Sequence, residues 1–162
     1  MVFRSEDTDS ERSKREFEEE IVSGLRDLGI SWDNETIYRQ SERSPLYKTY
    51  IEKAIASGAF YLSREPSKKV ENVMVEVVRI KNPNKSITFN DMVRGDITFD
   101  TTELGDIVVA RSVDDALYHL SVVIDDFEMG ITHVLRGDDH ISNTPRQILI
   151  QEALGISRPM YA

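Results

Sequence analysis

Two short polar segments carry the side chains best suited to bind a charged small molecule. The first is Arg4–Asp9, where Glu6, Asp7 and Asp9 place three carboxylates within four residues. Carboxylates this close repel one another unless cations or the ammonium group of a ligand share the space. A structural role is the alternative, since Asp and Ser before a helix cap its N-terminus and favour the positive end of its dipole.

The second segment is Arg136–His140, which follows an apolar run at 131–135. An Arg just beyond a buried strand can bind a carboxylate or phosphate in bidentate fashion, because its planar guanidinium matches either group. Gly137 would permit a close backbone turn, and the N-terminus of the helix that follows would favour an anion. The alternative is a surface Arg–Asp pair, which contributes little to stability.

Other polar groups point less clearly to chemistry. Tyr118 and His119 begin a predicted helix, where an aromatic is usually core and a lone His is usually a satisfied polar residue. Asp125–Asp126 and Asp138–His140 could suggest a metal site, but the usual spacing of His and carboxylate ligands is missing. The chain also lacks the two common phosphate-binding glycine loops and the G-x-S-x-G elbow of hydrolases.

Composition excludes several classes of protein. No apolar run approaches the roughly 20 residues of a membrane-spanning helix, and the N-terminus lacks the apolar region of a secretory signal. The absence of Cys rules out a disulfide scaffold, a thiol nucleophile and Cys-ligated zinc, and fits a cytoplasmic location. A net charge of −9 argues against broad nucleic-acid binding, but leaves room for a specific RNA contact through a local basic patch.

The first stretch of the chain, about 2–62, predicts a short strand followed by helices. After a strand at 2–5, apolar residues at helical spacing predict one helix that Gly29 ends. Ser13 and Glu16 have the spacing of a capping box, and residues 9–10 could cap an earlier start. The predicted apolar face comprises Phe17, Ile21, Leu25 and Leu28.

A second helix and then a β-rich region are predicted next. Ser44 as N-cap and Pro45 at the first helical position open the helix, which Gly58 ends. Over 63–112 the pattern changes to β-branched and alternating residues with turns between them, typical of a small, mainly antiparallel sheet. Strands are expected at 73–80, 87–89, 96–100 and 107–110.

The last stretch returns to alternating helix and strand. Residues 116–129 predict a helix that Asp114 or Asp115 caps and Gly130 stops, and 131–135 predict a buried strand.

The chain is expected to close with one more helix. Thr144 and Gln147 have capping-box spacing with Pro145 at the first helical position, and Gly155 ends this helix. Strand and helix patterns on both sides of the β-rich region predict an α/β fold, whose parallel sheet is interrupted by an insertion.

A series of sequence blocks stands in order along nearly the whole chain. They are FRSEDTD at 3–9 with Arg12-Ser13, LGISWD at 28–33, YRQSER at 38–43, VRGDITFD at 93–100, YHL through DD at 118–126, MGITHV at 129–134 and RGDDHISNTP at 136–145. Each block is weak alone, but together and in this order they closely resemble bacterial-type glutamyl-tRNA synthetases and are specific to that family.

The resemblance implies a partial Rossmann-like class I synthetase catalytic domain, interrupted by a small α+β acceptor-binding insertion. Residues 1–40 and 117–162 would be two parts of the nucleotide-binding fold, and 41–116 the inserted domain. The implied activity joins glutamate to the 3′ end of its tRNA, with Mg²⁺-bound ATP as substrate. The implied partners are glutamate, ATP and the acceptor end of tRNA(Glu), with no membrane and no protein-bound zinc.

The resemblance also implies roles for individual residues. Glu6 matches the residue that holds the α-ammonium group of glutamate, and Arg136 the one that pairs with its γ-carboxylate, so both are expected to face a common pocket. Tyr118 matches a side-chain recognition residue, and Val122 stands where some relatives have Asn. Asp139 matches an acidic ATP contact, and Thr8, Arg12, Ser41 and Arg43 would lie near the tRNA acceptor end. No catalytic side chain is assigned.

The family's P-x-P-S-P-T-G-x-x-H-x-G and K-M-S-K-S loops, which bind ATP, are absent from the sequence. The resemblance therefore implies a fragment that is inactive alone and that could dimerise through exposed sheet edges. Two alternatives stay open: a non-catalytic tRNA- or partner-binding paralogue, and the related glutamyl transferase that acts on a modified tRNA base.

Overall fold

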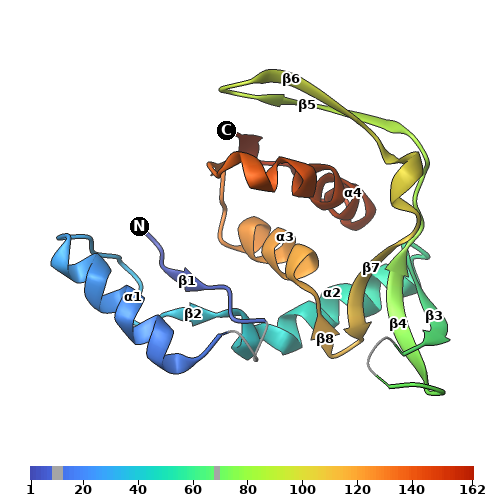
Figure 1. The fold of residues 1–162 in the computed structure, drawn as a ribbon, viewed down its shortest axis with the longest axis horizontal. Helices are drawn as coiled ribbons and strands as arrows, with labels where there is room; N and C mark the ends of the chain where they lie inside the picture. Colours follow the sequence, from blue (N-terminus) through green and yellow to red (C-terminus); the bar gives the residue numbers. More distant parts are fainter. Residues whose placement is uncertain (9–12, 68–69) are drawn as a thin grey trace. The chain divides into compact units, whose positions relative to one another are not determined.

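The computed structural model describes residues 1–8, 13–67 and 70–162. Their elements fall into two compact units, Met1–Pro45 and Leu46–Ala162 (Figure 1). None of the helices in these described residues is long and apolar enough to cross a membrane.

The first unit joins one helix to a pair of very short parallel strands. Its elements in chain order are β1 (Arg4–Ser5), α1 (Arg15–Asp27), β2 (Tyr38–Arg39) and the 3-10 turn η1 (Gln40–Arg43). β1 pairs with β2. Asn34 fixes the start of β1, because its side chain accepts from the Phe3 amide at 2.8 Å and donates to the Phe3 carbonyl at 3.0 Å.

The helix predicted from residue spacing is confirmed as α1, but its apolar face is not buried within the described residues. Phe17 is 46% exposed and Ile21 57% exposed. The predicted capping box is wrong, since Lys14 is the N-cap residue and its side chain makes no cap hydrogen bond. Gly29, with φ +75°, follows the helix as predicted. The alternative cap at 9–10 lies outside the described residues.

An antiparallel sheet begins the second unit. Its strand order is β3-β4-β7-β8, and all neighbouring strands run antiparallel, as the sequence predicts. The prediction missed the first strand, which ends in Pro66; this residue is tolerated because the strand lies at the sheet edge. The strands are β3 (Phe60–Pro66), β4 (Met74–Ile80), β7 (Ile107–Ser112) and β8 (Asp115–Ala116).

A second sheet joins the β-rich region to the end of the chain. β5 and β6 form an antiparallel hairpin, and β10 pairs in parallel with both β5 and β9. The predicted strand at 131–135 is shorter than expected: among the described strands it pairs with β10, over β9 alone, and Leu135 is 82% exposed. The strands are β5 (Ser86–Asp91), β6 (Gly95–Asp100), β9 (His133–Val134) and β10 (Met160–Tyr161).

Three helices pack with these sheets around a common core (Figure 1). They are α2 (Ser44–Ala56), α3 (Tyr118–Glu128) and α4 (Thr144–Leu154), with 3-10 turns η2 (Thr101–Leu104) and η3 (Asp138–Asn143). Fully buried apolar side chains come from all three helices and from the sheet β3-β4-β7-β8: Ile51, Phe60, Val78, Val109, Leu120, Ile124, Ile148 and Ile150.

The predicted caps of α2 and α3 are wrong. Ser44 already has helical dihedrals, because η1 runs directly into α2, and its hydroxyl donates to the Ser41 carbonyl. Leu117 is the N-cap residue of α3. Asp115 lies in β8 and pairs with Arg111 instead. Asp115 is thus held in a backbone pairing with β7 and does not cap the helix, so α3 starts two residues later than predicted.

Candidate functional site

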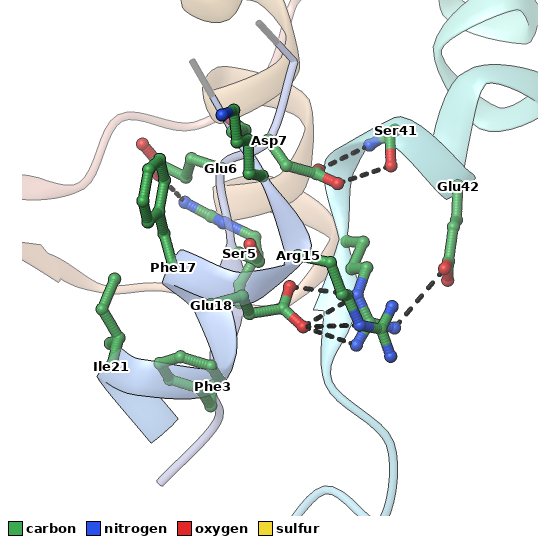
Figure 2. Close-up of a pocket in the computed structure, with 14 residues that line it drawn as sticks. Phe3, Ser5, Glu6, Asp7, Arg15, Phe17, Glu18, Ile21, Ser41 and Glu42 are labelled. Carbon is green, nitrogen blue, oxygen red and sulfur yellow. Dashed lines mark hydrogen bonds and ion pairs between the residues drawn. The ribbon is translucent and has the colours of Figure 1, made fainter. Parts of the chain in front are cut away.

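A cavity of about 550 Å³ in the first unit gathers the acidic segment that follows β1 (Figure 2). Glu6 and Asp7 both line it, and Ser41 of η1 lies opposite. Asp7 accepts hydrogen bonds from the Ser41 amide at 2.9 Å and the Ser41 hydroxyl at 2.6 Å. The Arg4 guanidinium donates to Glu6 Oε1 at 2.9 Å. Glu6 and Asp7 thus have a cation and two hydrogen-bond donors beside them, as their charge requires, whereas Asp9 lies outside the described residues.

An ion pair that the sequence analysis missed forms one wall of this cavity. The Arg39 guanidinium of β2 donates to both carboxylate oxygens of Glu18 on α1, at 2.7 to 3.1 Å. Both side chains are mostly buried, 16% and 12% exposed. The hydrogen bond from Arg39 lowers the pKa of Glu18 despite its burial, and the same bond raises the pKa of Arg39. This pair connects α1 to the two-stranded sheet.

The predicted acceptor-end residues lie only partly within the described chain. Thr8 is half-buried and directly follows Asp7. The Arg43 guanidinium lies over the Tyr38 ring, 5.7 Å from its centroid. Arg12 lies outside the described residues.

In the second unit, Arg136 lines a smaller cavity of about 140 Å³. Its Nη1 donates to Gln147 Oε1 at 2.8 Å, and its Nη2 donates to Thr144 Oγ1. The Tyr161 ring lies against the guanidinium, 5.6 Å from centroid to Cζ. Among the residues that the structure describes, no carboxylate forms an ion pair with Arg136. Its partners are therefore neutral.

These contacts overturn the predicted capping box at the start of α4. Asn143 is the N-cap residue, with no side-chain cap, and Thr144 is already helical. The two residues with capping-box spacing, Thr144 and Gln147, instead turn their oxygens to Arg136. A guanidinium offers only donors, so it competes directly with backbone amides for such oxygens. The predicted C-terminal Gly155 is confirmed, with φ +67°.

The loop after Arg136 carries Asp138 and Asp139, which have different surroundings. Asp138 pairs with Arg94 of the β5–β6 turn, through Oδ1 at 2.9 Å from Nε and a second contact from Nη2. The side chain of Asp139 is 80% exposed and lies 3.5 Å from His140 Nε2. Asp139 is thus open to a ligand, whereas Asp138 is already paired.

The first turns of α3 place the other predicted residues. Val122 is buried, and the Tyr118 ring lies 5.2 Å from the ring of His119. Burial above all, together with the charges of Arg146, Arg136 and His140, lowers the pKa of His119 to about 4. Among described residues, His119 Nδ1 is buried and has no hydrogen-bond partner. This imidazole is therefore neutral at pH 7.

The predicted residues are divided between the two units, and Tyr118, Val122 and Asp139 are not among the residues that line the Arg136 cavity. Glu6, Thr8 and Ser41 belong to the first unit; Tyr118, Val122, Arg136 and Asp139 belong to the second. Because Glu6 and Arg136 lie in different units, the expectation that they face a common pocket stays a prediction. Sequence reasoning missed Gln147 and Tyr161 as neighbours of Arg136, since only tertiary packing reveals that contact.

The chain is similar to known proteins over nearly its whole length. The family model described as tRNA synthetases class I (E and Q), catalytic domain, matches residues 1–76 and 62–162. A glutamate–tRNA ligase of Nitratidesulfovibrio vulgaris strain DP4 is 42% identical over 187 residues, covering 99% of this chain and 40% of that protein. The glutamate–tRNA ligase of Aquifex aeolicus is 41% identical, covering 100% of this chain and 41% of that protein.

A solved structure has the same fold. The crystal structure of a glutamate tRNA ligase from Elizabethkingia meningosepticum, in complex with its amino acid, matches with a TM-score of 0.89 and 27% identity. The match covers 99% of this chain and 41% of that one. The predicted α/β synthetase fold with a mainly antiparallel insertion is thus confirmed, and the chain spans about 40% of the length of these relatives. The family model covers the chain from end to end, so the chain belongs to the class I (E and Q) tRNA synthetase catalytic domain family.

Proposed function

We propose that the chain is part of a glutamate–tRNA ligase and supplies the side chains that select glutamate. The observation that carries this proposal is Arg136, whose guanidinium has neutral partners in the described residues and lines a cavity. A charge in that state favours an anionic ligand. A neutral glutamine side chain in the same place would leave the guanidinium without its carboxylate, and that penalty is the source of selectivity.

In the proposed reaction, the α-carboxylate of glutamate attacks the α-phosphate of Mg²⁺-bound ATP. Glutamyl-adenylate forms and pyrophosphate leaves; a hydroxyl of the terminal tRNA adenosine then takes the glutamyl group and AMP leaves. Positioning and charge stabilisation accelerate both steps. Glu6 binds the α-ammonium group, Arg136 the γ-carboxylate, Tyr118 and Val122 the side chain, and Asp139 the ATP.

The proposal divides the chain as the resemblance does. Residues 1–40 and 117–162 contribute to the nucleotide-binding fold, and 41–116 form the inserted domain that binds the acceptor end. Thr8, Arg12, Ser41 and Arg43 lie beside that end of the tRNA. The protein works in the cytoplasm without bound zinc, and the 162-residue chain alone forms a non-native dimer through its open sheet edges.

Glutamate-dependent exchange of pyrophosphate into ATP tests the activity. We expect no exchange by the 162-residue chain. We expect exchange by a chimera in which this chain replaces the matching 40% of the Nitratidesulfovibrio vulgaris ligase. If the chimera folds well but catalyses no pyrophosphate exchange, whichever amino acid is supplied, the proposal would be contradicted and a non-catalytic binding module favoured. Pyrophosphate exchange by the 162-residue chain alone would contradict the expectation that activity needs the rest of the ligase.

A further inference from the structure

The contacts of Arg136 point to a role for α4 that rests on the proposed function and extends it. We propose that Thr144 and Gln147 are positioning residues, which hold the Arg136 guanidinium for a carboxylate ligand without cancelling its charge. They act through Arg136 and do not touch the reacting atoms.

The arrangement is built rather than incidental. Thr144 is 2% exposed, Gln147 3% and Tyr161 5%, so three nearly buried side chains surround one guanidinium. The two oxygens bind different η nitrogens, Nη1 to Gln147 and Nη2 to Thr144. Two bonds on separate nitrogens fix both the position and the plane of the fork, and this removes rotamer freedom before a ligand arrives.

The orientation of the Gln147 amide supports this role. Its oxygen faces Arg136, while its Nε2 is buried and has no hydrogen-bond partner in the described part of the chain. An unpaired buried donor destabilises a protein. A Glu at this position would avoid that penalty and pair with Arg136, but its carboxylate would neutralise the positive charge of the guanidinium. The amide therefore holds the guanidinium at some cost in stability and leaves its charge available.

The neighbouring charges are arranged to the same effect. Asp138 lies two residues after Arg136, yet its carboxylate pairs with Arg94 of the β5–β6 turn. The Tyr161 ring attracts the guanidinium through its π face, which does not neutralise it. The first contact pairs Asp138 with another cation, and the second leaves the charge of Arg136 in place.

The test compares the same substitution at two buried positions of α4. Gln147→Glu places a carboxylate against Arg136. Gln151→Glu is the matched control, since Gln151 is 4% exposed one turn later and its oxygen accepts from the Tyr161 hydroxyl at 3.2 Å. Circular dichroism checks that both variants fold.

The first measurement uses the 162-residue chain and acetate as the carboxylate probe. We expect acetate to shift the guanidinium ¹⁵N resonances of Arg136 in the wild type and in Gln151→Glu. In Gln147→Glu the apparent affinity should fall at least tenfold. Equal titrations in the two variants, or no shift in the wild type, would overturn the proposal. This measurement does not depend on the ligase activity.

The second measurement uses pyrophosphate exchange in the active chimera. Gln147→Glu should raise KM for glutamate at least tenfold, change kcat less than threefold, and reduce the preference for glutamate over glutamine. Thr144→Val should raise KM, and Thr144→Ser, which keeps the oxygen, should stay within about twofold of wild type. A wild-type chimera without exchange counts against the proposed function alone. An unchanged amino-acid preference in Gln147→Glu counts against the positioning role.

Discussion

The Tyr47 hydroxyl of α2 donates a hydrogen bond of 2.8 Å to Asp125 Oδ2 of α3, and both side chains are buried. The two residues are 78 positions apart in the chain. In the proposed division, Tyr47 belongs to the insertion and Asp125 to the nucleotide-binding fold. The bond therefore ties the insertion to the helix that begins with Tyr118.

Tyr47→Phe should lower the free energy of unfolding by about 1–3 kcal/mol, because a buried carboxyl oxygen loses this donor. Urea denaturation followed by circular dichroism measures the change. Tyr50→Phe is the control: its hydroxyl donates to the exposed Glu128, so we expect less than about 1 kcal/mol. Equal decreases in the free energy of unfolding for the two variants would show that burial of the Tyr47 hydrogen bond does not add to stability.

His119 should make stability fall in mildly acidic solution. Its pKa in the folded chain is about 4, below the ordinary 6.5, so the unfolded chain binds the proton first as pH falls. Stability should decline between about pH 6.5 and pH 4, by about 1–2 kcal/mol for this partly exposed ring. His119→Gln should remove that part of the pH dependence, and His133→Gln, at an exposed ring, should not.

The Glu18–Arg39 pair should stabilise the first unit only while Glu18 is ionised. Arg39 lowers the pKa of Glu18, so the contribution is present above the unfolded pKa, near 4.3, and is lost as pH falls through the folded value. Glu18→Gln should cost about 1–3 kcal/mol at pH 7 and much less at pH 3. Glu19→Gln, at a side chain that is 72% exposed, should change stability by less than about 0.5 kcal/mol.

Two Gly→Ala substitutions should change the stability of the folded chain in opposite directions. Gly155 ends α4 with φ +67°, where an alanine Cβ is strained although nothing lies within 4 Å, so Gly155→Ala should cost about 1–2 kcal/mol. Gly24 lies inside α1 with open space around it, so Gly24→Ala should stabilise that helix by about 0.5–1 kcal/mol. Thermal denaturation of both variants measures the difference. Two changes of the same sign would contradict this account.

Arg136→Ala in the active chimera should reduce glutamate activation by about 2–4 kcal/mol in kcat/KM, the scale of losing a charged partner. Glutamine should be affected far less. Pyrophosphate exchange with each amino acid measures both. An unchanged preference for glutamate would remove Arg136 from its proposed role.

Periodicity predicted the helices well, because apolar spacing and a glycine stop are local signals. The helix through Phe17 and Ile21 forms although its apolar face is exposed, because spacing and the stop at Gly29 act locally. The caps failed where the same side chains have more distant partners. Asp115 on β8 pairs with Arg111 on β7, and Thr144 accepts a hydrogen bond from Arg136. Neither partner can be identified from the residue pattern that marks a helix start.

The candidate site could be predicted only through resemblance. Spacing drew attention to the segments that contain Glu6 and Arg136, but it left a helix cap for the first and a surface pair for the second as alternative explanations. The structure removes the surface pair for Arg136, since its hydrogen-bond partners are Gln147 and Thr144. The role of Gln147 could not be predicted from the sequence, because it depends on the tertiary contact between its side-chain amide and Arg136.

The second sheet continues through β10 from the β5–β6 hairpin to β9, with backbone bonds from Met92 to Tyr161, from Arg136 to Ala162 and from Ala162 to Val134. Amide groups in one continuous ladder open together. In deuterated water, the amide protons of Met92, Arg136 and Ala162 should therefore show similar protection factors, which compare each measured exchange rate with the rate of an unstructured chain. Loosening the hairpin would then expose the backbone beside Arg136 to solvent at the same moment.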